Sequence, residues 1–352
     1  MINSAIFEAY INYMSYITKN LLILLLVCPS ISAFAQYTET INSNRPGASQ
    51  GAFSVGRQVV QGETGIDFGN DTHSLRFYDS DIFGINLGLR YGLLIEQLEL
   101  NANIRYQVNS INFTQGNVQD DVISGLENLQ LGAKYLVYDP YKYATDEVNL
   151  YSYHANKRFK WKTLIPAVSV YASAVFDLTA NPFREFLAAG SGIVIEKSVS
   201  PNIALITQHN WGRWVWVNNV IADRISTDFP SYMWITTMTH SFNPKVSGFL
   251  EFQLIDGDLY ADYLIRTGGA YLITKDFQVD VSGLVNFKDT PSRWNIGIGL
   301  SYRMDFHDKD QKLEIKDSGK GSAKRQSDRI NKKSKKKRKD AVEPDGDDGG
   351  EN

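Results

Sequence analysis

Hydrophobic and polar residues alternate one by one over residues 294–306, the last stretch before a charged tail. The apolar positions are Ile296, Ile298, Leu300, Tyr302, Met304 and Phe306, and those between them are Asn295, Gly297, Gly299, Ser301, Arg303 and Asp305. Side chains alternate across a β-sheet, so the pattern predicts a strand with one apolar face and one face of glycine, serine and charge. A soluble β-sandwich would show the same pattern, so the rest of the chain must decide.

The same alternation recurs along the chain and predicts twelve strands. The clearest in the first half is 98–107, where leucine, alanine, isoleucine and tyrosine alternate with glutamate, asparagine, arginine and glutamine. The predicted strands are residues 60–68, 82–91, 98–107, 128–137, 163–176, 187–196, 203–211, 232–242, 246–254, 262–273, 277–287 and 294–306. Their lengths suit the roughly 10 residues that a tilted strand needs to cross a bilayer.

The predicted connections between these strands fall into two classes. Short turns are expected at 198–202, 243–245 and 274–276, and longer loops at 177–186 and 212–231. Outer-membrane barrels have short periplasmic turns and longer outer loops, so this division fits a barrel with both chain ends on the periplasmic rim. The tyrosine-rich insert 139–160 is an exception, because it is long yet falls on the side of the short turns.

The first residues of the chain have the features of an export signal. Lys19 precedes the apolar run 21–27, and Ala33-Phe-Ala35 supplies the small residues that a signal peptidase recognises, so the mature chain is expected to begin at Gln36. The sole cysteine, Cys28, is an alternative lipoprotein site, although the residue before it is not the small one that such a site needs. Cleavage at Gln36 leaves no thiol for disulfides, metal binding or nucleophilic catalysis.

Composition then separates a membrane barrel from a helical membrane protein. After the signal, no segment approaches the roughly 20 consecutive apolar residues of a membrane helix. Tyr, Trp and Phe make up 12% of the chain, which suits the two aromatic girdles of an outer-membrane barrel. We therefore predict an all-β fold: a closed, antiparallel, up-and-down transmembrane β-barrel of about twelve strands in the outer membrane of a Gram-negative bacterium. A secreted sandwich is the alternative.

The chain divides into a signal peptide at 1–35, an N-terminal segment at 36–58, the barrel at 59–307 and a disordered charged tail at 308–352. Residues 42–57 are polar and rich in glycine and cannot pack against lipid, so we expect them in the lumen or at its periplasmic mouth. The basic run 332–339 in the tail resembles a nucleic-acid-binding patch, but the export signal argues against that partner. Contact with anionic envelope polymers and a merely solvated tail both remain open.

Polar residues on the inward faces of the predicted strands are the candidate functional residues. We expect these to line the lumen: Glu99, Asn101, Asn103, Arg105, Gln107, Asn128, Gln130, Lys134, Glu251, Gln253, Asp280, Asn286 and Arg303. In a wide pore, acidic and basic walls create a transverse field, whereas in a narrow barrel the same residues pair and close the lumen. Simple filling of the interior is a third interpretation.

Aromatic residues on the outward faces are the candidate interfacial girdle, namely Tyr106, Trp214, Trp216, Tyr302 and Phe306. Trp214 and Trp216 share one face of an extended chain, so a site for an apolar or aromatic ligand is an alternative for this pair. A girdle position follows from the general preference of tryptophan and tyrosine for the membrane–water interface.

Catalysis has little support in the sequence. His240 and Ser241 are a possible pair for nucleophilic attack, but adjacent strand residues point to opposite faces and cannot hydrogen-bond in a regular strand. The other histidines, His73, His154, His209 and His307, are scattered. No metal-ligand spacing, phosphate-binding glycine loop or dinucleotide fingerprint occurs, so we expect no enzyme activity, no cofactor and no metal.

Short motifs carry a resemblance to a known family. They are Asn44-Arg-Pro-Gly-Ala-Ser-Gln-Gly-Ala-Phe53, Val59-Val-Gln-Gly-Glu63, Leu89-Arg-Tyr-Gly-Leu93, Leu98-Glu-Leu100 and Phe277-Gln-Val-Asp-Val281. Over about residues 41–306 the chain resembles the outer-membrane transporter-like family named for the meta-pathway of phenol degradation. The resemblance implies a channel for small molecules, hydrophobic or aromatic ones among them. The insert and the tail depart from the family pattern, and no site residue is carried over.

These observations together predict an outer-membrane channel for passive passage of small solutes, hydrophobic or aromatic ones included. Its expected partners are outer-membrane lipid, a small-molecule solute and the outer-membrane assembly machinery, which would engage the terminal strand; no nucleic acid is expected. One alternative is a closed structural or ligand-binding barrel whose tail and insert contact envelope partners. A membrane-embedded hydrolase is the other.

Overall fold

The computed structural model of the chain describes residues 41–115, 119–141, 164–177, 182–188 and 199–306. The predicted signal peptide, the charged tail and most of the 139–160 insert lie outside the described residues, and what we expect of them stays a prediction. Among the described residues, no helix has the length and apolar character needed to cross a membrane.

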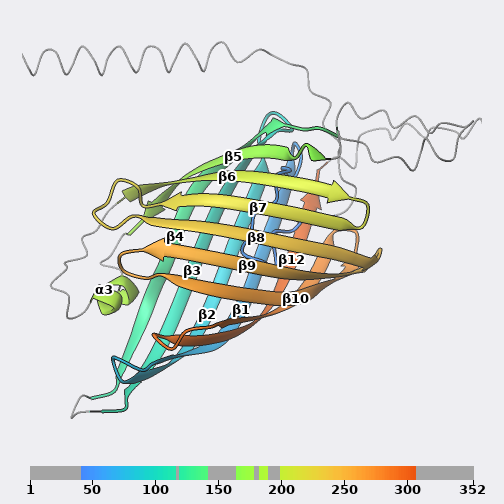
Figure 1. Ribbon diagram of the computed structural model, residues 1–352. Coiled ribbons are helices and arrows are strands. Elements are labelled where there is room, and N and C mark those ends of the chain that lie inside the picture. Colours follow the sequence, from blue (N-terminus) through green and yellow to red (C-terminus); the bar gives the residue numbers. More distant parts are fainter. Residues whose placement is uncertain (1–40, 116–118, 142–163, 178–181, 189–198, 307–352) are drawn as a thin grey trace, which may run out of the picture. The chain divides into compact units, whose positions relative to one another are not determined.

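Twelve antiparallel strands form one closed barrel, each strand pairing with the next along the chain and β12 pairing with β1 (Figure 1). The strands are β1 (Val59–His73), β2 (Tyr78–Gly92), β3 (Leu98–Phe113), β4 (Asp121–Tyr138), β5 (Ala167–Phe176), β6 (Val199–Trp211), β7 (Trp214–Asp223), β8 (Ser231–Asn243), β9 (Val246–Gly257), β10 (Asp262–Thr274), β11 (Phe277–Asn286) and β12 (Ser292–Asp305). A short helix, α3 (Pro182–Ala188), follows β5. The predicted fold class, a closed all-β barrel of about twelve strands, is confirmed.

The alternation in the sequence becomes an inside and an outside of the barrel wall. In β12, Ile298 and Tyr302 are 55% and 52% exposed on the outer face, whereas Ser301 and Arg303 are 0% and 3% exposed on the inner face. Most of the other strands follow this rule, so large apolar side chains cover the outside while polar and charged ones are buried within, except where part of the inner face of β5, β6 and β7 is apolar. This inversion of the usual distribution is that of a barrel whose outer surface faces lipid.

Three of the predicted segments are wrong, and the errors in two of them cancel in the strand count. The predicted strand 187–196 begins inside α3, and its remainder lies outside the described residues. The predicted loop 212–231 instead contains β7, which a two-residue turn joins to β6. Gly212 occupies the first turn position with a φ of 63°, the positive value that such tight hairpins require. The predicted turn 198–202 is also wrong, since it lies largely within β6.

The strand β7 escaped prediction because apolar residues lie on both of its faces. Inside the barrel at this place is an apolar cluster made of Ala52, Leu136, Ala167, Tyr171, Ala204, Ile206 and Val217. Inward-facing Val217 therefore follows outward-facing Trp216, and the chain loses the hydrophobic–polar alternation that marks the other strands. Hydrophobic–polar alternation therefore does not predict a strand where the barrel interior is apolar.

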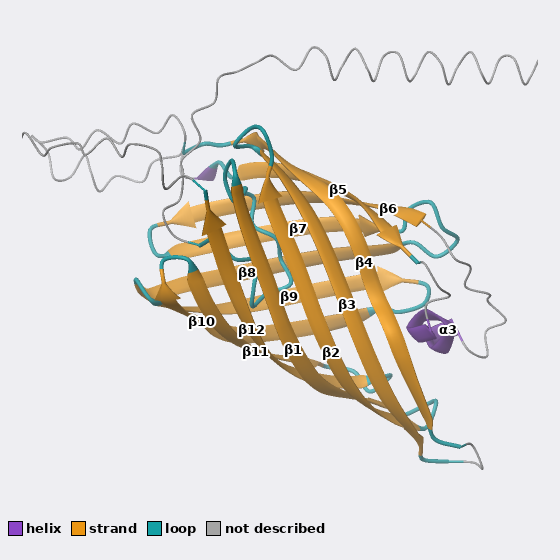
Figure 2. Cartoon of the chain, turned by 180° about the vertical axis from the view of Figure 1, so that it is seen from behind, coloured by secondary structure: helices purple, strands orange, loops and turns teal. Residues whose placement is uncertain are grey.

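The connections confirm the predicted asymmetry between the two rims of the barrel. The rim that carries both barrel ends, here called the terminal rim, has turns of two residues between β6 and β7, β8 and β9, and β10 and β11. The opposite rim, the loop rim, carries the longer connections, including the one that contains α3 (Figure 2). The insert between β4 and β5 starts and ends at the terminal rim, as the sequence predicts. By the general asymmetry of such barrels, the terminal rim corresponds to the periplasmic side.

Candidate functional site

The segment that precedes β1 lies within the barrel, where it makes contacts with several strands (Figure 1, dark blue). We call residues 41–57 the internal segment. Its residues form no helix or strand, so their backbone groups need partners from elsewhere. Inward-facing side chains of the wall provide those partners.

The middle of the internal segment is bound by β7 and β9. The backbone N–H of Gln50 donates to the side-chain oxygen of Asn219 at 2.6 Å, and the Asn219 amide donates to the Gln50 carbonyl at 2.9 Å. The carboxylate of Glu251 accepts from the backbone N–H groups of Ala48 and Ser49 at 3.0 and 3.2 Å. These two wall residues hold three consecutive residues of the segment.

A buried cluster of charge holds the end of the internal segment nearest β1. The Glu99 carboxylate accepts two hydrogen bonds from the Arg90 guanidinium, at 2.9 and 3.0 Å, and lies 3.2 Å from the Lys134 ammonium. The same carboxylate accepts from the backbone N–H of Val55 at 2.9 Å. Lys134 also donates to two carbonyl oxygens of the segment, at 2.9 and 3.0 Å. Glu99 and Lys134 are fully buried, so paired charges without access to solvent close the barrel interior at this level.

Arg45 anchors the other end of the internal segment. Its guanidinium pairs with Asp280 on β11 at 3.2 Å. The side chain crosses the inner face of Gly65 on β1 and Gly299 on β12, which face each other in the ladder that closes the barrel. A Cβ atom on either glycine would overlap the guanidinium, so the two glycines together make the groove for Arg45.

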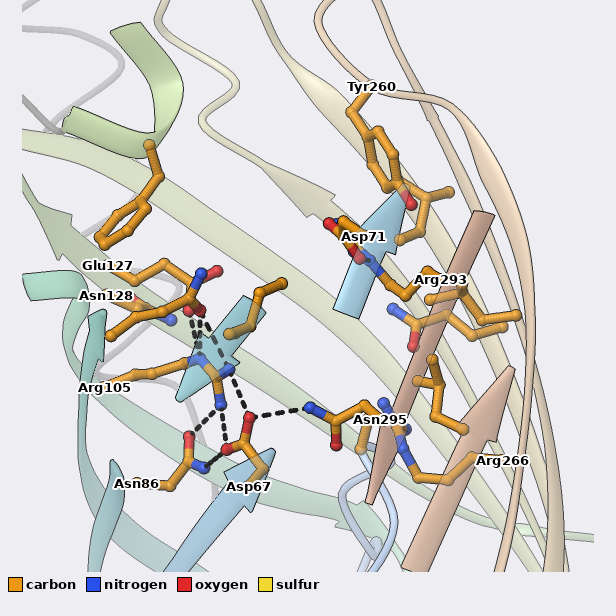
Figure 3. Close-up of a pocket in the computed structure, with 18 of the residues that line it drawn as sticks. Asp67, Asp71, Asn86, Arg105, Glu127, Asn128, Tyr260, Arg266, Arg293 and Asn295 are labelled. Atoms are coloured by element: carbon orange, nitrogen blue, oxygen red, sulfur yellow. Dashed lines mark hydrogen bonds and ion pairs between the residues drawn. The ribbon is translucent and has the colours of Figure 1, made fainter. Parts of the chain in front are cut away.

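The terminal-rim half of the interior is therefore occupied, and the loop-rim half is open. Around Ala52 the internal segment packs on the apolar cluster, and the ring of Phe53 lies 6.1 Å from that of Tyr141. Beyond the segment, a cavity of about 610 Å³ extends towards the loop rim. Residues 45–48 and Phe183 of α3 line it. Tyr260, on a loop of the loop rim, lines it as well (Figure 3).

Arginines dominate the wall of this cavity, which we call the vestibule. Its charged lining residues are six arginines (Arg45, Arg105, Arg184, Arg224, Arg266 and Arg293) and four carboxylates (Asp67, Asp71, Glu127 and Asp258). Each of these arginines pairs with a carboxylate on the wall or just behind it, so their positive charge is balanced.

Most of these charged side chains pair with an oppositely charged side chain nearby on the wall and not with one across the barrel. Arg105 on β3 donates to both oxygens of Asp67 on β1, at 2.7 and 2.9 Å, and also pairs with Glu127 (Figure 3). Asn86 and Asn295 donate to the same Asp67 carboxylate at 2.7 and 2.9 Å. This lateral pairing leaves the vestibule open, which a pairing across the lumen would not.

Tyr260 stands at the mouth of the vestibule, on the loop between β9 and β10. Its ring lies 5.1 Å from both the Lys288 ammonium and the Arg293 guanidinium carbon. Burial, opposed by nearby Arg293 and reinforced by the bond to Asp262, raises the pKa of the Tyr260 hydroxyl above its ordinary value. The hydroxyl therefore stays protonated and donates to the Asp262 carboxylate, fixing the ring at the entrance.

All thirteen residues predicted to line the lumen occupy inward-facing strand positions. Those buried are Glu99, Asn101, Gln107, Gln130, Lys134, Glu251, Gln253, Asp280 and Arg303, and those partly exposed are Asn103, Arg105, Asn128 and Asn286. The structure brings Glu99 and Lys134 together, whereas Asp280 and Glu251 bind the internal segment.

Sequence reasoning missed several residues of equal weight in the site. They are Arg45, Glu63, Asp67, Asp71, Arg90, Asn219, Arg266 and Arg293. Extending the alternation of β1 would have identified the two inward carboxylates Glu63 and Asp67, because they share the polar face of a predicted strand. No signal in the sequence pairs Arg45 with Asp280, which is 235 residues away.

The predicted girdle residues occupy different levels of the barrel wall. Trp214 begins β7 at the terminal rim, with its ring 4.2 Å from that of His240. Trp216 stacks on His209 at 5.3 Å and donates to the Thr236 hydroxyl. Outward-facing Tyr302 and Phe306 lie near the terminal-rim end of the chain's last strand, and Tyr106 lies midway along β3.

The family model described as "Putative MetA-pathway of phenol degradation" matches residues 43–304. The chain belongs to this family. The resemblance seen in the sequence motifs is thereby confirmed. The phenol-degradation family match begins within the internal segment and ends in β12, so it includes the segment as well as the barrel. No curated protein matches the chain in sequence.

Three solved structures are similar to this family member at low identity. The COG4313 outer membrane channel from Pseudomonas putida F1 is 11% identical, with a TM-score of 0.48 over 75% of this chain and 100% of that chain. The β domain of the Bordetella autotransporter BrkA is 10% identical, with a TM-score of 0.43 over 70% and 100%. The translocator domain of the autotransporter NalP from Neisseria meningitidis is 8% identical, with a TM-score of 0.40 over 70% and 88%. These likenesses are too distant to bear on function.

Proposed function

We propose that this protein is an outer-membrane channel for the passive passage of small molecules, with the internal segment as its gate. The observation that carries the proposal is the vestibule, a cavity of about 610 Å³ that ends on residues 45–48 of a segment bound through hydrogen bonds and ion pairs. A barrel built only for structural support has no need of such a cavity.

Passage through the barrel requires the internal segment to move. The segment has no helix or strand of its own, and its anchors are polar contacts with separate strands, so parts of it can detach one at a time. It connects to β1 at the terminal rim, so a detached segment would leave by the periplasmic mouth. The vestibule would then continue into the terminal-rim half.

The proposed solutes are small molecules, including aromatic ones. The vestibule wall combines Phe183, Phe229 and Tyr260 with arginine and asparagine side chains. An aromatic compound that bears a hydroxyl or carboxylate group would find apolar and polar partners in such a wall. The description of the family, which refers to phenol degradation, agrees with this class.

The apolar outer surface of the barrel indicates its membrane partners. A closed barrel with an apolar exterior and an export signal belongs in the outer membrane of a Gram-negative bacterium, where lipid covers the exposed leucines, isoleucines and valines. The assembly machinery would recognise the terminal strand β12, which ends in outward-facing aromatic residues. We do not expect enzyme activity, since His240 and Ser241 occupy successive positions of β8 and so point to opposite faces.

The second candidate function is a closed barrel that binds a ligand or supports the envelope. The buried group of Arg90, Glu99 and Lys134 favours it, because paired charges without solvent access are costly to separate. In this alternative the vestibule is a binding site with one entrance.

Single-channel conductance in a planar bilayer tests the proposal. The mature protein, residues 36–352, is compared with a variant that begins at Gln58 and so lacks the internal segment, and with a control variant that begins at Ile41 and retains it. We expect brief openings for the mature protein and the control, and steady conductance after removal of the segment. Silence of all three variants would reject the channel and leave the closed barrel.

A further inference from the structure

A second cavity lies beside the vestibule. Its volume is about 240 Å³, and it shares Ala48, Asn128, Arg224 and Gln253 with the vestibule wall. The two cavities therefore adjoin, and a molecule in the vestibule lies next to this second space.

Side-chain amides set the chemistry of the second cavity, which we call the amide cavity. Six of them line it, from the internal segment and four different strands: Gln50, Asn128, Gln130, Asn202, Asn219 and Gln253. Asp223 and Arg224, the two charged residues on the described wall, pair with each other at 2.5 Å. The wall thus presents many hydrogen-bonding groups but no net charge.

Three of these amides have oxygens that accept no hydrogen bond from the described residues. They are the side-chain oxygens of Gln50, Asn128 and Asn202, all buried. For Asn202 the orientation of the amide is settled, because its nitrogen donates to the Asp223 carboxylate at 2.9 Å and a carboxylate can only accept. Buried polar atoms without partners are uncommon in folded proteins, and each calls for a donor.

The unpartnered oxygens do not belong to the machinery that holds the internal segment. The Asn219 side chain accepts from the Gln50 backbone N–H at 2.6 Å and donates to the Gln50 carbonyl at 2.9 Å. These bonds hold the Gln50 backbone and leave the Gln50 side chain free to meet a ligand. The terminal torsion of an Asn or Gln side chain is broad, so such an oxygen can turn to meet a ligand. The Tyr171 hydroxyl lines the same cavity beside Gln50 and is likewise buried without a hydrogen-bond partner among the described residues. A ligand that fits must therefore bring several donors together with acceptors.

We propose that the amide cavity is a binding subsite for a small neutral polyhydroxylated molecule of the sugar or polyol class. Hydroxyl groups both donate and accept, so they match amides, which present one acceptor and two donors each. An anion would find no net positive charge, because Asp223 and Asp177 both lie against the Arg224 guanidinium, at 2.5 and 3.7 Å. An aromatic hydrocarbon would leave the amide oxygens without partners. The inference rests on the proposed channel function and adds a hydroxyl-rich class to the solutes expected there.

Calorimetric titration of the folded barrel in detergent with xylose tests this inference. The two test variants are Gln50→Met and Gln130→Met, which keep the side-chain length and remove one amide from the cavity. The matched control is Gln278→Met, because Gln278 donates to the Arg45 carbonyl at 3.3 Å and lies outside the cavity lining. The heat-dependent gel mobility of each variant checks that it is folded.

We expect xylose to bind the wild type and the control alike, with Kd raised roughly tenfold in each test variant for the loss of about one hydrogen bond. Phenol and benzoate should not displace it. Absence of xylose binding, as expected if the cavity holds only water, would overturn the inference. So would an unchanged Kd in both test variants, or displacement of xylose by phenol.

Conductance of the same preparations separates this inference from the proposed function. If the barrel conducts but does not bind xylose, the proposed subsite is rejected and the channel proposal stands. If the barrel binds xylose through Gln50 and Gln130 but never conducts, the subsite is supported and the channel proposal fails. If a test variant does not fold, the structure of the wild type soaked with xylose decides, since sugar density between these amides would support the subsite and its absence would reject it.

Discussion

The ion pair between Glu99 and Lys134 offers a sharp test of how the barrel interior is closed. Both side chains are fully buried, 3.2 Å apart, and both also hold the internal segment. Replacing either one with an uncharged residue, Glu99→Gln or Lys134→Met, leaves the buried cluster around Arg90 with one uncompensated charge. Breaking a buried pair in this way costs about 3–5 kcal/mol of the free energy of unfolding.

The double variant distinguishes pairing from simple loss of contacts. With both charges removed, Arg90 retains Glu63 at 3.3 Å, so the cluster becomes neutral again. We therefore expect the double variant to lose about 2 kcal/mol less than the sum of the two single variants. The control is Lys275→Met, because the Lys275 side chain is 58% exposed and 3.8 Å from Asp276, and should change stability by no more than about 0.5 kcal/mol.

Urea unfolding of the protein in lipid vesicles, followed by fluorescence of its six tryptophans, measures these differences. Losses of under about 1 kcal/mol in both single variants would refute the account of a tightly coupled buried cluster. Strict additivity in the double variant would refute the pairing itself, since independent sites add.

Three further perturbations test the site. Gly65→Val should displace the Arg45 side chain, destabilise the barrel by about 1–3 kcal/mol and lengthen the openings in bilayer recordings. The control Gly62→Ala has open space around its Cβ position and should change neither the stability nor the openings. Arg105→Glu should shift ion selectivity towards cations, measured as a reversal potential across a salt gradient; an unchanged potential would remove Arg105 from the conducting wall. Asn219→Leu removes two hydrogen bonds to the internal segment, so amide hydrogen exchange there should accelerate roughly 30-fold, and unchanged exchange would contradict the anchoring role.

The sequence was sufficient for the architecture wherever the two faces of a strand differ in polarity. In β3 over residues 98–109 and in β12 over residues 294–305, inward positions hold polar residues or glycine and outward ones apolar residues, because lipid and a polar interior impose opposite demands on successive residues. The same rule located the thirteen inward-facing polar residues. It failed at β7, where the interior is apolar, and at α3, a short helix with no strand partner.

The sequence by itself thus determined eleven of the twelve strands, their inward and outward faces, and the expectation that the polar stretch before β1 does not contact lipid. Only the tertiary structure decided that this stretch fills half of the interior, which charges pair, and where the two cavities lie. The physical reason is that these features depend on closure of β12 against β1, which brings Gly65 and Gly299 together to form one groove for Arg45. Alternation specifies the direction of each side chain, whereas the contact between Arg45 and Asp280 joins residues from opposite ends of the chain.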